Sequence, residues 1–144
     1  MFTTKFDRYA CENDTITCNV DGFDVTARIV RDDNYSIDDD DSHNPDTNVT
    51  GCNRAQQAKL LKARQAWKND EWFYCGIVIS VSRSEIVLSD HASSLWGIEC
   101  NYPEGDNSYL SDVANELLPE AVETAEGIIE RLLLSLGKEA VSAE

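Results

Sequence analysis

An apolar stripe at helical spacing runs along the C-terminal part of this 144-residue chain. Such a stripe is stable only when another layer covers it. Helical sequence extends from about residue 108 to residue 136, and Pro119 either kinks it or lies in the first turn of a second helix. The pattern predicts contact with the protein core or with a second copy. The stripe consists of Leu118, Ala121, Val122, Ala125, Ile129, Leu132 and Leu136.

Strand patterns in the first half of the chain can provide the covering layer. Residues 15–20 are rich in β-branched side chains, and Asp21 and Gly22 have the composition of a two-residue turn. Residues 23–30 then alternate between apolar and polar side chains, as in a strand with one buried face. The sequence therefore predicts an antiparallel hairpin.

The middle of the chain is predicted to contain a loop, a helix and two more strands. Residues 32–52 are acidic and without periodicity, which indicates a flexible, solvated loop. Gly51 or Asn53 can cap a helix that ends near Lys68. Further strand sequence lies at residues 73–81, then at 85–89 after a turn at 82–84, and again at 95–98.

These elements predict a single α+β domain over residues 1–144. Consecutive strands joined by short turns pair antiparallel, so about four strands form one sheet, with the helices packed on one face. The expected order is strand, strand, helix, strand, strand, helix.

Charge is distributed unevenly along the chain. The formal net charge is -15 and the pI is about 4.3. Residues 1–52 carry -8, residues 53–69 carry +5, and residues 70–144 carry -12. A protein this acidic repels nucleic acid and anionic lipid, so neither is an expected direct partner.

Two groups of carboxylates are candidates for binding a basic partner. The first lies along the C-terminal helix, opposite the apolar stripe, and the second lies in the acidic loop. Their members are Glu116, Glu120, Glu123, Glu126 and Glu130 in the helix, and Asp38, Asp39, Asp40 and Asp41 in the loop. The basic residues of the middle helix either neutralise these groups or bind RNA or an acidic partner; they are Arg54, Lys59, Lys62, Arg64 and Lys68.

No catalytic or cofactor motif is recognisable, so we expect no enzyme activity, no cofactor and no metal site. An EF-hand loop starting at Asp38 would need Gly at His43 and Glu at Val49. His91 and Asp90 are neighbours in sequence, and a polar turn explains them better than a catalytic triad does. Five cysteines fit neither a disulfide framework nor paired zinc ligands, and Cys75 is expected to be buried.

The chain contains no apolar run long enough to span a membrane and no signal-peptide core at the N-terminus, so we expect it in the cytoplasm without membrane association.

Part of the sequence resembles small uncharacterised proteins encoded by bacteriophages and other mobile elements. The resemblance covers about residues 67–135 and implies no catalytic residue. In charge and size the chain is also similar to anti-restriction and anti-CRISPR proteins, several of which imitate DNA. The residues that carry the first resemblance are Asp70-Glu71-Trp72-Phe73-Tyr74-Cys75-Gly76-Ile77-Val78, Ser94-Leu95-Trp96-Gly97-Ile98-Glu99 and Tyr109-Leu110.

Two hypotheses of function follow. The first is a phage-type inhibitor whose carboxylates occupy a basic, nucleic-acid-binding surface on a host protein or nucleoprotein complex. The second is an interaction or scaffold protein that binds through apolar and aromatic contacts, with its acidity serving solubility only. Either protein could act as a homodimer.

Overall fold

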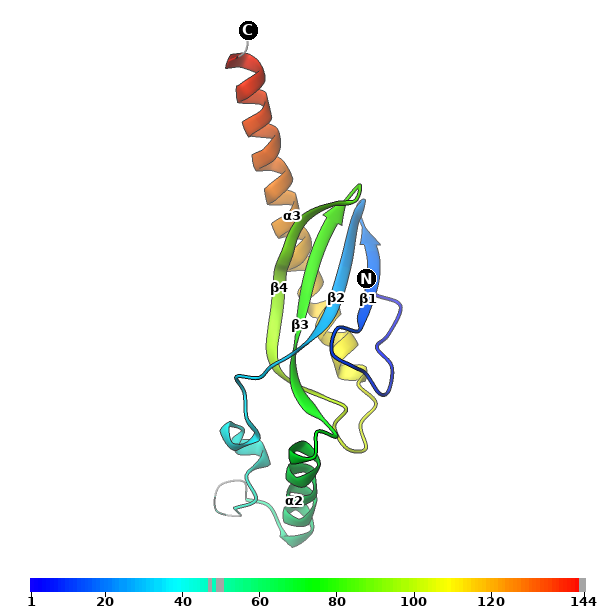
Figure 1. The fold of residues 1–144 in the computed structure, drawn as a ribbon, viewed down its shortest axis with the longest axis vertical. Helices are drawn as coiled ribbons and strands as arrows, with labels where there is room; N and C mark the ends of the chain where they lie inside the picture. The colour runs from blue at the N-terminus through cyan, green and yellow to red at the C-terminus, as the bar shows by residue number, and fades with distance from the viewer. Residues whose placement is uncertain (47, 49–50, 143–144) are drawn as a thin grey trace.

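The computed structural model describes residues 1–46, 48 and 51–142 (Figure 1). The predicted α+β fold class and order of strands and long helices are confirmed. The elements are β1 (Thr15–Val20), β2 (Phe23–Arg31), the short 3₁₀ helices η1 (Ile37–Asp39) and η2 (Asp41–His43), α2 (Arg54–Lys68), β3 (Phe73–Arg83), β4 (Ile86–Cys100) and α3 (Ser108–Ser142).

The four strands of the described chain form one antiparallel sheet in the order β1-β2-β3-β4. Asp21 and Gly22 join β1 to β2 with φ angles of 53° and 88°, the two positive values that a type I′ turn requires. Ser84 and Glu85, also at positive φ, form the turn between β3 and β4, slightly later than predicted. β4 is continuous, because irregularities in its register with β3 absorb the residues that the sequence predicts as an interruption.

Helix α3 packs across one face of the sheet and completes the main core (Figure 1). Alternate residues of β2, namely Val25, Ala27 and Ile29, are completely buried there. Cys75 is buried in the same core, as predicted. The core also holds Phe2 near the N-terminus, whose backbone N–H donates to Asn115 Oδ1 on α3 at 2.8 Å.

Only part of the predicted apolar stripe faces this core. α3 is continuous through Pro119, so the alternative of a second helix starting there is wrong. Ile129 is half-buried, and the last two members of the stripe, Leu132 and Leu136, are exposed because α3 extends past the end of the sheet (Figure 1). The buried members are Leu118, Ala121, Val122 and Ala125.

A second, smaller core lies at the end of the sheet opposite to the end past which α3 projects (Figure 1). Helix α2 packs at this end and not on the face of the sheet that α3 covers (Figure 1). Ile37 of η1 is buried against Trp72 and Tyr74. The Trp72 indole N–H donates to the carbonyl of Ala63 in α2 at 2.8 Å. Within residues 32–52, for which the sequence predicts a flexible loop, η1 and η2 thus make packing contacts with the rest of the fold. Residues 47, 49 and 50 of that segment lie outside the described part.

A close contact on the other face of the sheet depends on Gly76. A Cβ atom at this position of β3 would overlap the indole ring of Trp96 on β4. Trp96 and Gly97 lie at an irregularity of the β3–β4 register, where Gly97 has a φ of 72°. Gly76 therefore leaves room for the Trp96 ring to lie against the sheet.

We predict that Gly76→Ala destabilises the protein by about 1–3 kcal/mol, because the new methyl group forces the indole ring away from β3. Urea denaturation measures the change. Gly76→Ala should cost less in a Trp96→Ala background, and an equal cost in both backgrounds would contradict the contact. Gly127→Ala is the control: it lies in helix α3 with open space around it and should stabilise by about 0.5–1 kcal/mol.

Candidate functional site

The five glutamates predicted as a partner-binding stripe are all exposed on α3. Burial of Ala121 and Ala125 against the sheet fixes the rotation of the helix, so the opposite side points into solvent. Among the described residues, no ion pair involves these glutamates. Glu120 has one neutral contact, since it accepts a hydrogen bond from Ser93 Oγ at 3.1 Å. The stripe is thus an ordered row of unneutralised carboxylates.

The acidic run at residues 38–41 does not join this stripe. η1 and η2 lie beside α2 at one end of the molecule, and the last turns of α3 project at the other end (Figure 1). Asp38 forms a salt bridge with Arg64 of α2, and Asp39 completes the capping box of η1 by accepting from the backbone of Ser36. The two candidate acidic groups therefore lie on different parts of the molecule, and part of the 38–41 run is used within the fold.

The basic helix α2 begins as predicted, with Asn53 rather than Gly51 as its cap. One of its five basic residues, Arg64, neutralises the acidic run through Asp38. Its other four have no ion pair within the described chain. α2 lies beyond the end of the sheet, away from the face that α3 covers, and leaves the glutamate stripe unneutralised (Figure 1).

A buried histidine joins the acidic run to the sheet. His43 is 5% exposed and packs against the rings of Trp72 and Tyr102, which also contact each other. Its Nε2 is 2.6 Å from Glu99 Oε1 on β4 and 3.6 Å from Asp40 Oδ2. This cluster holds the end of η2 against β4.

The surroundings of His43 favour its charged form. The hydrogen bond to Glu99 is the largest influence on the pKa of His43 and raises it. Burial lowers this pKa, the negative charges of Glu99 and Asp40 raise it, and the positive charge of Arg64 lowers it; the net result is a raised pKa. Burial acts to raise the pKa of Asp40, but hydrogen bonds from Ser42 and Tyr74 outweigh it and lower the pKa. Burial and the hydrogen bond to Asp40 raise the pKa of the Tyr74 phenol.

Asp40, His43 and Glu99 are also the described residues whose potential metal-ligand atoms converge, all within 4.8 Å of one another. The 2.6 Å contact between His43 and Glu99 has the length of a short charge-assisted hydrogen bond. The buried Nδ1 of His43 has no hydrogen-bond partner among the described residues, which is unfavourable for a metal-bound and for a protonated ring alike, so the short contact decides between the two. The geometry therefore fits an ion pair better than a metal site.

Sequence reasoning missed this cluster. His43 and Glu99 are far apart in the chain, and His43 lies in an acidic segment without periodicity. The available signal was Tyr35 and Ile37 beside the acidic run, because an apolar pair in an otherwise polar loop favours packing.

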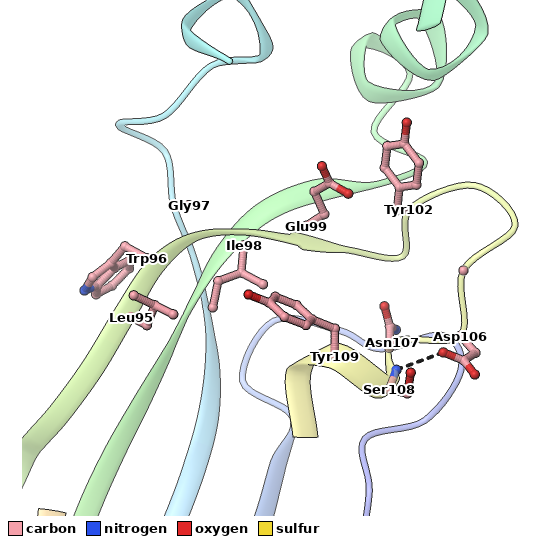
Figure 2. A pocket seen from close by; sticks show the side chains of 11 residues that line it. Leu95, Trp96, Gly97, Ile98, Glu99, Tyr102, Asp106, Asn107, Ser108 and Tyr109 are labelled. Carbon is pink, nitrogen blue, oxygen red and sulfur yellow. Dashed lines mark hydrogen bonds between the residues drawn. The ribbon is translucent and has the colours of Figure 1, made fainter. Parts of the chain in front are cut away.

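A shallow hollow of about 460 Å³ lies between β4 and the start of α3 (Figure 2). Leu95, Trp96 and Tyr109 line it and keep large exposed fractions. In Figure 2, Tyr109 lies beside Ile98 on one side of the β4 ribbon, and Glu99 projects on the other side, toward α2. The hollow is an exposed apolar and aromatic surface separate from the glutamate stripe.

Comparison with protein-family models finds no match, and comparisons with curated proteins and with solved structures find none either. Among the described residues, no helix combines the length and hydropathy needed to cross a lipid bilayer.

We predict that the free energy of unfolding falls as the pH rises from about 6 to 8. The pKa of His43 is higher in the folded state than in the unfolded state, where it is about 6.5. Protonated His43 therefore stabilises the fold fully below the unfolded-state pKa, and this stabilisation is lost as the pH rises through the folded-state pKa. Glu99→Gln should reduce this loss, because it removes the main cause of the shift. Urea denaturation across this pH range measures both proteins.

Glu104→Gln, which removes an exposed carboxylate from the loop after β4, should keep the wild-type pH dependence. Identical pH dependence in the wild type and in Glu99→Gln would contradict the role of the His43–Glu99 pair.

Proposed function

We propose that this chain is a non-enzymatic, phage-type inhibitor that binds a basic, nucleic-acid-binding surface of a host defence complex. The observation that supports the proposal is the row of glutamates on α3, exposed and without ion pairs among the described residues. Association would be accelerated by the opposite field of a lysine- and arginine-rich groove.

The cost of the stripe supports a role in binding. Four pairs of glutamates at i,i+3 or i,i+4 spacing repel each other by about 0.2–0.5 kcal/mol each, or about 1–2 kcal/mol together. A face that served solubility alone could carry lysine at half of these positions. The repulsion is relieved when a cationic partner approaches, so the same charges that weaken the free helix favour the complex.

The spacing indicates which feature of nucleic acid the stripe could imitate. From Glu116 to Glu130 the helix rises about 21 Å, which gives one carboxylate per roughly 5 Å. Duplex DNA carries one charge per about 1.7 Å. The stripe alone therefore resembles the phosphates of a single strand, and the acidic run at residues 38–41 lies beside α2 rather than along α3 (Figure 1).

We predict that replacing four stripe glutamates by Gln weakens capture of partners from host lysate while leaving thermal stability equal or higher. The variant is Glu116→Gln, Glu120→Gln, Glu123→Gln and Glu130→Gln. Proteins captured by the wild type should be released by duplex DNA and by about 0.5 M NaCl, because both compete with or screen the carboxylates.

The matched control removes the same amount of charge elsewhere, from exposed glutamates outside α3: Glu12→Gln, Glu71→Gln, Glu85→Gln and Glu104→Gln. It should retain capture. Equal loss in the two variants would show that only net charge matters, and unchanged capture by the stripe variant would refute the proposal.

The hollow beside β4 favours a second candidate function, an interaction protein that binds through apolar and aromatic contacts. Trp96 and Tyr109 are exposed aromatic residues of the kind that anchor interfaces. If this function holds, Trp96→Ala with Tyr109→Ala abolishes capture, whereas 0.5 M NaCl and the stripe variant change it little. The same pull-down with these variants therefore separates the two candidates.

A further inference from the structure

The tip of α3, residues 127–137, is the most exposed apolar segment of the described chain. It projects past the end of the sheet (Figure 1): Ile129 near its base still packs against the main core, and residues 130–137 beyond it are exposed. Its four leucines remain largely exposed: Leu132 at 48%, Leu133 at 65%, Leu134 at 61% and Leu136 at 60%.

The tip continues the same stripe that packs on the sheet. Val122 and Ala125 are buried, and Ile129, Leu132 and Leu136 follow them at alternating intervals of three and four residues. This is the spacing by which one helix packs along another. Leu134 lies outside the stripe, since two residues of helix place it about 200° from Leu136.

The charge of the tip favours a second copy of the chain over a charged partner. The protein carries -15 overall, but the tip contains one acid, Glu130, and one base, Arg131, and is formally neutral. A basic partner would be attracted to the acidic body and not to this segment. Two identical tips can meet without bringing the acidic bodies together, provided that the helices run antiparallel.

We propose that the tip of α3 is a dimerisation surface, in which Leu132 and Leu136 of one copy pack against the same stripe of a second copy in an antiparallel helix pair. The glutamates at 116–126 then remain outside the interface, on the side of the helix opposite the stripe. The dimer does not depend on the function proposed above, because it uses a different part of α3.

Analytical ultracentrifugation of the full chain tests the proposal. The wild type should dimerise, and Leu136→Glu should raise the dissociation constant by at least about tenfold, because the symmetric interface buries the new charge twice. Leu134→Glu is the matched control: it changes a leucine of almost equal exposure on the opposite side of the tip and should have an effect below about threefold.

Salt separates this dimer from the proposed binding of a basic partner. Added NaCl screens repulsion between two acidic bodies, so it should strengthen the dimer, whereas it weakens attraction to a cationic surface. Small-angle scattering should give a maximum dimension well above that of the Leu136→Glu monomer, as an antiparallel overlap of tips requires. A wild type that stays monomeric, equal effects of the two substitutions, or a dimer no longer than the monomer would overturn the proposal.

Discussion

Packing of α3 on the sheet is the interaction on which the rest of the structure depends. Leu118, Ala121, Val122 and Ala125 bury one side of the helix against apolar residues of the strands. Small residues let the helix lie close to the sheet and leave little freedom to rotate about its axis. Once that side is fixed, the 3.6-residue repeat determines that the glutamates point into solvent. The acidic stripe is a consequence of how the core is built.

The two groups of acidic residues have different environments although both are rich in carboxylates. At residues 38–41 the carboxylates take part in the fold: Asp38 pairs with Arg64, and Asp40 lies beside Tyr74 and His43. The five stripe glutamates on α3 face solvent, and no ion pair within the described part of the chain involves them. The available cations explain the difference, because α2 carries its basic residues to the end of the sheet where η1 and η2 pack. An unneutralised charge remains available to a partner, and a paired one does not.

The sequence predicted the elements whose signal is local. Asp21 and Gly22 specify a tight turn, and the alternation over β2 identifies its buried face, so the hairpin could be read directly. The rotation of α3 also followed from periodicity. In the candidate site, the five glutamates were correctly predicted to lie on the exposed side of the helix, although nothing in the sequence could place residues 38–41 relative to them.

The features that the sequence did not predict depend on contacts between distant segments. His43 meets Glu99 across 56 residues of chain, and no local pattern marks that pair. Ile37 of η1 is buried against Trp72 and Tyr74, which lie far along the chain at the start of β3, so no local pattern marks this contact either. The position at which the sheet ends beneath α3 likewise depends on how the four strands assemble. The sequence alone could therefore not indicate where the apolar stripe of α3 changes from buried to exposed.

The central claim is that the glutamates of α3 directly contact lysines of a partner. Zero-length carbodiimide cross-linking of the complexes captured from lysate, followed by mass spectrometry, tests this contact because it joins a carboxylate to an amine only where the two touch. The account predicts cross-links from Glu116, Glu123, Glu126 and Glu130 to lysines in a nucleic-acid-binding groove. Cross-links confined to carboxylates outside α3 would contradict it.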